Sequence, residues 1–393
     1  MKGIRDCELV KVERISPADG FHYYYGYYDN PALTADDRMH LCNRVSFMDR
    51  LPQAGDICEL GWFDLETKEF HGFAQTAAWN FQQGCMLQWL GGHDGCAVYN
   101  SWNGTDYEAI IHNVFTGEKR VLPNPVANVS PDGKWGIVLN FNRIYDFRPG
   151  YGYCNRQDPW KDIPAPDADG LRVMNMETGE THMLFSYHQL EEIFADKEVY
   201  KGRKIVINHA TFNTDSDRLL FLLRYFPEPG GEWETALGTT DVQGNIYKLR
   251  GYTYASHYFW KDRKTLLIYA DGGEGPGLYE LTDGTQEYKL YDKAFFNQDI
   301  HCSYSPDHEF IIGDGYADAE GYRPLFLYHR ASGRGMLLGR FYSPDLGNFD
   351  IRSDLHCRWM HGGTQITFDS IHEGFRGLYR MDLSEAMASL NNK

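Results

Sequence analysis

The run His301-Cys-Ser-Tyr-Ser-Pro-Asp-His308 decides the fold, because its pattern occurs four times in the second half of the chain. In each copy a histidine stands three residues before an aromatic residue, and a polar turn follows. The other copies are His209-Ala-Thr-Phe212, His257-Tyr-Phe-Trp260 and His356-Cys-Arg-Trp359. Successive histidines are 44 to 55 residues apart, and repeats of about 40 to 50 residues are typical of β-propeller blades. The repeat therefore predicts equivalent imidazoles on neighbouring blades.

Two kinds of turn extend this repeat over the whole chain. The first follows a short apolar strand, as at Ser130-Pro-Asp-Gly133 and Asn213-Thr-Asp-Ser216. The second joins two later strands, as at Phe115-Thr-Gly-Glu118 and Glu177-Thr-Gly-Glu180. Seven turns of each kind predict an all-β fold, a seven-bladed β-propeller of four-stranded blades in a single domain over residues 1–393.

The expected blades follow one another without a linker, over residues 20–78, 79–125, 126–198, 203–252, 254–293, 297–344 and 350–384. Residues 7–15 alternate like a strand, and we expect them to close the last blade. Residues 145–170 carry four prolines and read as a long loop inside the third blade. The only helical pattern lies at residues 187–197.

Composition narrows the classes of partner. The net charge of −17 argues against nucleic acid or an anionic membrane as partner, since both require a basic face. No apolar run reaches the roughly 18 residues of a membrane span. The first residues lack the apolar region of a secretory signal, and the eight cysteines form no Cys-x-x-Cys pair. We therefore expect a cytoplasmic protein with reduced thiols; its oligomeric state is not indicated.

The repeated histidines predict a metal site. The first strand of each propeller blade lines the central channel, so we expect four imidazoles to converge at its mouth as ligands of a divalent transition metal. These ligands are His209, His257, His301 and His356. The corresponding positions of the first three blades are Asn30, Met86 and Val126. Nitrogen ligands suit Zn, Mn, Fe, Ni or Cu, among which we expect Zn or Mn; the alternative is a cluster that bonds only to itself or to water.

Blades four to seven resemble oligogalacturonate lyases, which are seven-bladed enzymes of pectin breakdown. The matching runs are Ser256-His-Tyr-Phe-Trp-Lys-Asp262, His301-Cys-Ser-Tyr-Ser-Pro-Asp307, Ile312-Gly-Asp-Gly315 and Asp354-Leu-His-Cys-Arg-Trp359. The resemblance implies a divalent metal at the channel mouth that binds a uronate carboxylate. It also implies that His257 abstracts the proton α to that carboxylate, and that His301 and His356 are metal ligands.

The chain departs from that family at three functional positions. Asp354 stands where the family has a further histidine ligand, and Asp350 and Ile351 stand where it has a glutamine ligand. Ala236 stands in place of the catalytic arginine. Another arginine could replace it, and the candidates are Arg224, Arg143, Arg148 and Arg156.

A weaker resemblance links the front half to propeller lyases that cleave ulvan, through Trp79-Asn-Phe-Gln-Gln-Gly84 and Asn208-His-Ala-Thr-Phe-Asn213. Those enzymes hold a structural zinc and use histidine, tyrosine and arginine from other blades. The corresponding candidates here are His93, His112, Tyr151, Tyr153 and Arg172.

Together these patterns predict a metal-binding lyase that cleaves uronate-containing oligosaccharides or polysaccharides by β-elimination. Metal and arginine would neutralise the carboxylate while an imidazole removes the α proton. The expected catalytic residues are His257, Arg224, Tyr153 and His112. If all four repeated histidines bind metal, the base must come from His93, His112 or the tyrosines of the blade-three loop. The alternative is a non-catalytic binding or scaffold propeller with a structural or relic metal site, since propellers host unrelated functions.

Overall fold

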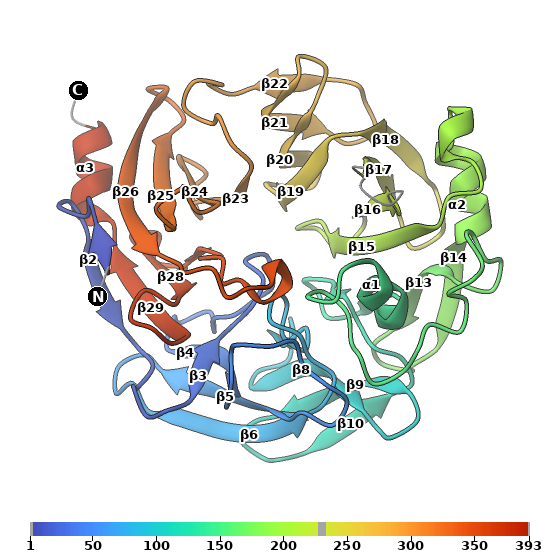
Figure 1. Ribbon diagram of the computed structural model, residues 1–393, viewed down its shortest axis with the longest axis horizontal. Coiled ribbons are helices and arrows are strands. Elements are labelled where there is room, and N and C mark those ends of the chain that lie inside the picture. The colour runs from blue at the N-terminus through green and yellow to red at the C-terminus, as the bar shows by residue number, and fades with distance from the viewer. Residues whose placement is uncertain (1–2, 227–232, 392–393) are drawn as a thin grey trace.

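The computed structural model describes residues 3–226 and 233–391, and these form seven antiparallel sheets arranged in a ring around one axis (Figure 1). The predicted all-β, seven-bladed propeller is confirmed. Within each blade, strands that follow one another in the chain pair as neighbours, so the first strand is innermost and the last outermost.

The first four blades are built as follows. Blade one has β3 (His22–Tyr24), β4 (Met39–Val45), β5 (Cys58–Asp64) and β6 (Phe70–Thr76). Blade two has β7 (Gln88–Trp89), β8 (Cys96–Trp102), β9 (Tyr107–Asn113) and β10 (Lys119–Leu122). Blade three has β11 (Asn128–Val129), β12 (Trp135–Val138), β13 (Gly170–Asn175) and β14 (Thr181–Ser186). Blade four has β15 (Ile205–Phe212), β16 (Leu219–Tyr225), β17 (Thr235–Thr240) and β18 (Tyr247–Thr253).

The remaining blades complete the ring. Blade five has β19 (Ala255–Trp260), β20 (Thr265–Asp271), β21 (Pro276–Thr282) and β22 (Tyr288–Leu290). Blade six has β23 (Ile300–Tyr304), β24 (Phe310–Gly315), β25 (Tyr322–His329) and β26 (Arg334–Tyr342). Blade seven has β27 (Arg358–Trp359), β28 (Gln365–Ser370) and β29 (Gly377–Asp382).

The N-terminal segment supplies the missing outer strand of blade seven. β2 (Lys11–Arg14) pairs antiparallel with β29, with Val12 opposite Met381, and it lies at the outer edge of the ring in Figure 1. The predicted closing strand is therefore confirmed. The structure adds a shorter strand, β1 (Ile4–Arg5), which pairs with β26 on the outer edge of blade six. The segment thus ties the last two blades together.

The described residues include three α-helices, which lie outside the seven sheets. α2 (Tyr187–Phe194) falls in the predicted helical stretch and has a capping box formed by Ser186 and Gln189. The prediction that helix is confined to that stretch was wrong, because α1 (Phe141–Phe147) and α3 (Ser384–Asn391) are also present. Both are short and show no long apolar period in sequence. α1 opens the predicted insertion of blade three, between β12 and β13, and lies near the centre of the ring in Figure 1.

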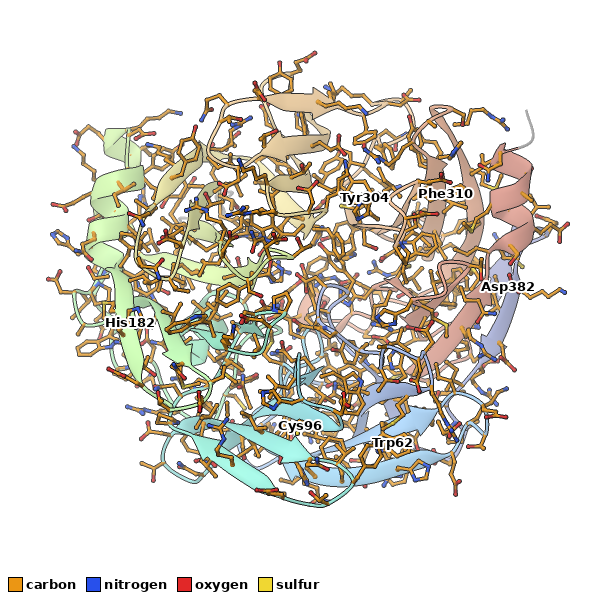
Figure 2. All side chains as sticks on the ribbon, turned by 180° about the vertical axis from the view of Figure 1, so that it is seen from behind. Trp62, Cys96, His182, Tyr304, Phe310 and Asp382 are labelled. Atoms are coloured by element: carbon orange, nitrogen blue, oxygen red, sulfur yellow. The ribbon has the colours of Figure 1, made fainter. Side chains whose placement is uncertain are left out.

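Adjacent blades pack face to face through apolar side chains. β16 reads Leu-Leu-Phe-Leu-Leu over residues 219–223 because successive side chains of a strand point to opposite faces and both faces here are buried. Phe221 and Leu223 belong to the core shared with blade three, whereas Leu220 and Leu222 belong to the core shared with blade five. From the opposite face, Trp62, His182 and Asp382 lie in the outer part of the ring (Figure 2). Among the described residues no helix is long and apolar enough to cross a membrane.

Candidate functional site

Four buried histidines lie in or just before the innermost strands of blades four to seven. His209 is in β15, His257 in β19 and His301 in β23, and His356 lies two residues before β27. Each is at most 6% exposed. The ring centroids of His257 and His301 are 3.9 Å apart, and those of His301 and His356 are 4.4 Å apart. The geometry of the propeller thus brings residues from separate blades into contact.

Tyr27 lies among all four histidines and was not singled out by the sequence. Its ring centroid is 4.6 Å from that of His209 and 4.9 Å from that of His356. The centroids of His301 and His257 are 6.0 and 6.5 Å away. Tyr27 reaches this place through the turn at Gly26, whose φ of 112° strongly favours glycine. The preceding run of tyrosines is the only sequence signal for an aromatic side chain here.

His209 differs from the other histidines because both of its ring nitrogens have protein partners. Its Nε2 donates to Asp29 Oδ2 at 2.8 Å, and Gln83 Nε2 lies 3.4 Å from its Nδ1. An amide NH₂ can only donate, so Nδ1 accepts and its lone pair is engaged. The sequence predicts His209 as a metal ligand, but the structure leaves this imidazole with no free lone pair.

His301, Asp354 and His356 form the one group of three metal-ligating side chains found among the described residues, with ligand atoms within 4.8 Å of one another. His301 Nε2 and His356 Nε2 are buried and make no hydrogen bond to a described residue, and Asp354 Oδ2 has an ion pair with Arg352 as its close contact. An unsatisfied buried polar atom costs about 1–3 kcal/mol. A bound cation would satisfy both imidazole nitrogens and share the Asp354 carboxylate, so these residues fit a divalent metal.

A carboxylate behind His301 fixes the orientation of its ring. His301 Nδ1 lies 3.1 Å from Asp314 Oδ2, so Nδ1 carries the hydrogen and Nε2 presents its lone pair to the group. Such carboxylate–histidine pairs commonly support metal-binding imidazoles. His356 has a φ of 47°, which is unusual for a residue with a side chain and is found most often where function requires it.

The Asp354 carboxylate is shared between this group and two arginines. Its Oδ1 is 2.6 Å from Arg323 Nη1 and its Oδ2 is 2.8 Å from Arg352 Nη2. Burial raises the pKa of Asp354, but the two guanidinium groups outweigh burial and hold this pKa well below its usual range. Asp354 therefore stays ionised, as a metal ligand must be.

His257 forms a second carboxylate–histidine pair next to this group. Its Nδ1 lies 3.0 Å from Asp299 Oδ1 and 3.2 Å from Ser256 Oγ. Burial raises the pKa of Asp299, but the charge and hydrogen bond of His257 outweigh burial and lower it below its usual value. An ionised Asp299 accepts from Nδ1, which leaves Nε2 of His257 as the acceptor.

A cavity of about 390 Å³ opens beside His257. Its polar lining includes Asn208, His209 and Asp299, and its aromatic lining includes Tyr151 and Tyr316. This volume lies within the range of about 300–1,000 Å³ that is typical of small-molecule sites.

Two arginines line this cavity, and nearby carboxylates of the described residues neutralise little of their positive charge. Arg224 is 6% exposed and makes no hydrogen bond or ion pair with any residue in the described ranges, and its Nε is buried without a partner. Burial and the charge of Arg148 lower the pKa of Arg224 from its usual value. Arg148 has one distant ion pair, 3.8 Å to Asp350, and its Nη2 has no partner. Two adjacent cations of this kind favour an anionic ligand.

The structure does not bring the other two expected catalytic residues to this cavity. Tyr153 is fully buried, stacks on Phe141 at 4.4 Å and accepts a hydrogen bond from Asn100. His112 lies on β9, the third strand of blade two, with its ring 5.0 Å from that of Phe73. Neither residue is among those that line the cavity.

The remaining candidates divide in the same way. Tyr151 lines the cavity, and its hydroxyl accepts from Arg352 at 2.9 Å. Arg143 is buried in an ion pair with Asp158, and Arg156 pairs with Asp106. The other two candidates lie in separate pockets. They are His93 and Arg172.

Sequence reasoning missed Asp299 and treated Asp354 only as a departure from a family histidine, although a signal for both exists. Asp299 and Asp354 each stand two residues before the repeated histidine of their blade. Each reaches the histidine of the preceding blade, since Asp299 bonds to His257 and Asp354 groups with His301. An Asp-x-His pattern in consecutive blades is thus the signature of carboxylates that bridge to the neighbouring blade.

Comparison with known proteins supports the fold. No protein-family model and no curated protein matches this sequence. The structure of an oligogalacturonate lyase in complex with manganese has a TM-score of 0.70 and 16% identity, covering 98% of this chain and 96% of that chain. An oligogalacturonate lyase from Vibrio parahaemolyticus has a TM-score of 0.65 and 14% identity, covering 98% and 100% of the two chains.

Other propellers share the architecture. The tricorn protease has a TM-score of 0.51 and 11% identity, over 95% of this chain and 34% of that chain. The chain therefore resembles oligogalacturonate lyases in fold along its whole length. At these identities the likeness concerns the fold alone, and the activity must be argued from the site.

Proposed function

We propose that this protein is a metal-dependent lyase that cleaves uronate-containing oligosaccharides by β-elimination. The observation that carries the proposal is the junction of three features at one cavity. These are the His257–Asp299 pair, two arginines without close carboxylate partners among the described residues, and the adjacent group of His301, Asp354 and His356, in which both imidazole Nε2 atoms lack a hydrogen-bond partner. A lyase needs a base, an anion site and a means of stabilising the enolate-like charge.

His257 is the proposed base. Asp299 holds its Nδ1, so its Nε2 can accept the proton from the carbon α to the uronate carboxylate. The C–H electron pair then forms a carbon–carbon double bond, and the bond to the 4-linked sugar oxygen breaks. Asp299 stabilises the resulting imidazolium. The departing oxygen takes a proton from water or from a cavity phenol; burial raises the pKa of Tyr316, so its phenol remains protonated.

Arg224 is the proposed partner of the substrate carboxylate. It lies on β16 opposite Thr235, and both residues line the cavity, whereas Ala236 does not. Arg224 would then supply, from the face that borders the cavity, the positive charge that an arginine supplies in the oligogalacturonate lyases. Among the described residues Arg224 has no hydrogen-bond or ion-pair partner to lose when an anion binds, so its charge is available to the substrate.

His301, Asp354 and His356 are the proposed protein ligands of a divalent ion, for which Mn or Zn fits the donor set. When bound, such an ion supplies positive charge that withdraws electrons from the carboxylate and increases the acidity of the α proton. The manganese in the similar lyase structure supports this proposal. Asp314 keeps His301 Nε2 free of hydrogen, and the two arginines keep Asp354 ionised.

One observation favours the non-catalytic alternative. Asp354 already forms ion pairs with Arg323 and Arg352, so arginine charge could satisfy this carboxylate without metal. In that case the propeller would bind an acidic oligosaccharide without cleaving it. The cavity arginines would serve either function.

The experiment that separates the two functions is a product assay. Purified protein is incubated with oligogalacturonates, ulvan fragments and glucuronate-capped glycans, with added Mn²⁺ or Zn²⁺ and with a chelator. The proposal predicts an ultraviolet-absorbing unsaturated uronate that forms only with metal. Binding of the glycan without any unsaturated product under all metal conditions would contradict catalysis and support the alternative.

A further inference from the structure

Three large aromatic side chains stand exposed around one cavity. Trp233 is 41% exposed, Tyr254 45% and Phe349 59%, and all three line the cavity that contains His257. They come from separate elements: the approach to β17, the link between β18 and β19, and the 3-10 helix Phe349–Ile351. A soluble protein gains nothing in stability from exposing aromatic rings at one opening, so their grouping points to a ligand.

Arginines lie beside these rings. The guanidinium carbon of Arg148 is 5.6 Å from the ring centroid of Trp233 and 5.7 Å from that of Phe349. Arg352 lies 4.1 Å from the Phe349 centroid, and Tyr316 is stacked on Phe349 at 6.2 Å. These contacts hold the rings in place while leaving a large part of each exposed. The rim therefore offers aromatic surface and a cation side by side.

This combination matches an anionic sugar. The C–H faces of a pyranose pack on aromatic rings, whose faces are electron-rich, and its carboxylate pairs with arginine. The cavity of about 390 Å³ lies near the lower end of the range for small-molecule sites, about 300–1,000 Å³. It has room for the reacting unit, and the exposed rim lies where the next unit of a chain would pass.

We propose that Trp233, Tyr254 and Phe349 form a stacking rim that binds the sugar unit linked to the reacting uronate, and that Arg148 binds the carboxylate of that unit. The inference rests on the proposed function, because it places the reacting uronate beside His257. The rim makes affinity depend on chain length and on the charge of the second unit.

The test measures binding without turnover. In a His257→Gln background, the affinities for galacturonate and for trigalacturonate are determined by calorimetry. The parent background should bind the trimer more tightly, and Trp233→Ala and Phe349→Ala should each reduce trimer affinity about tenfold, with monomer affinity unchanged. Phe115→Ala and Tyr288→Ala remove aromatic rings of similar exposure elsewhere, at 64% and 44%, and should change neither affinity.

The role of Arg148 is tested with trimers whose non-reacting units are methyl-esterified. In the parent background esterification should weaken binding of the trimer. Arg148→Met should weaken binding of the free-acid trimer until it binds no more tightly than the ester. Arg148→Lys, which keeps the charge, should retain part of that advantage. A melting temperature of Arg148→Met below that of the parent background would identify a folding defect. In that case the test rests on Arg148→Lys and on the difference between its affinities for the acid and for the ester.

The outcomes separate the inference from the function on which it rests. If the rim variants weaken the binding of monomer and trimer equally, or weaken the binding of neither, the proposal of a stacking rim is wrong. This conclusion holds whether or not wild-type protein forms product. If chain-length dependence is lost in the rim variants but wild-type protein forms no product, the rim is supported and catalysis is not. If the parent background binds neither saccharide, both proposals fail.

Discussion

The two sides of the propeller bury polar side chains in different ways. In blades one and two, Asn43 Nδ2 donates to the Tyr25 carbonyl at 2.7 Å, and Asn100 both donates to the Val126 carbonyl and accepts from its amide at 2.8 Å. In blades six and seven, His301 and His356 each keep an Nε2 without a partner. These two amides are thus satisfied by the backbone, whereas each of these two imidazoles keeps one unsatisfied nitrogen.

The contrast teaches where to look for function in a repeated fold. A buried polar atom that bonds to the backbone stabilises the blade, whereas one left unpaired costs stability and is retained for a ligand. His209 shows that position in the repeat does not decide whether a histidine has a free nitrogen, because it occupies the repeated place but both its nitrogens are bonded. The hydrogen bonds of a side chain, rather than its position in the repeat, distinguish a structural residue from a candidate ligand.

The largest expected effect comes from comparing His257 with His209, which both pair with an aspartate. His257→Gln should lower kcat about 100- to 10,000-fold with substrate affinity largely kept, as expected for a general base. His209→Gln should act mainly through the Asp29 contact and lower kcat much less. Steady-state kinetics of unsaturated-product formation measure both, and equal losses in the two variants would remove the distinction.

A smaller effect separates satisfied from unsatisfied side chains. Asn43→Ala leaves the buried Tyr25 carbonyl without its partner and should cost about 1–3 kcal/mol in unfolding free energy. His356→Asn, measured without metal, removes an unpaired nitrogen and suits a positive φ, so it should change stability by about 0.5 kcal/mol or less. Denaturant unfolding provides both values. A costly His356→Asn would mean that this imidazole is structural.

The smallest effect concerns a structural histidine far from the site. Burial lowers the pKa of His40 to about 3, and its ring bonds to the Leu41 carbonyl and to Thr367. The pKa of His40 is lower in the folded than in the unfolded protein. The contribution of its neutral ring to the free energy of unfolding is therefore complete above the unfolded pKa of about 6.5 and is lost as pH falls toward 3. The loss should amount to about 1 kcal/mol between pH 6.5 and 5.5.

The check is the pH dependence of unfolding free energy for His40→Gln and for His188→Gln, which removes an exposed imidazole. Only His40→Gln should flatten the acid slope. If both variants keep the wild-type slope, His40 does not contribute to acid lability.

Much of the fold was predictable because its signals are local. Each blade repeats its turns, and the alternation of residues 7–15 indicated the closing strand that β2 provides. The short helices α1 and α3 were not predictable from periodicity. α1 is held by its Asn140 cap and by packing in the blade-three insertion.

The site was predictable only in part, since its pairings join different blades. The repeat indicated His257, His301 and His356, and the resemblance to lyases suggested their roles. Asp299 was missed, and Asp354 was noted only as a departure from a family histidine, because each acts on the preceding blade. The expected roles of Tyr153 and His112 came from the weaker resemblance to ulvan lyases, and the structure places both away from the cavity.

The central claim is that the unpaired Nε2 atoms of His301 and His356 and the carboxylate of Asp354 bind a divalent ion. The most direct test is the metal content of protein dialysed after Mn²⁺ or Zn²⁺ loading, measured by elemental analysis. Wild-type protein should retain one ion per chain. Asp314→Asn removes the carboxylate that orients His301 and also accepts from the Leu355 amide, and it should weaken binding about 10- to 100-fold. The double variant His301→Ala/His356→Ala should retain no ion; full retention by that variant, or none by the wild type, would contradict the account.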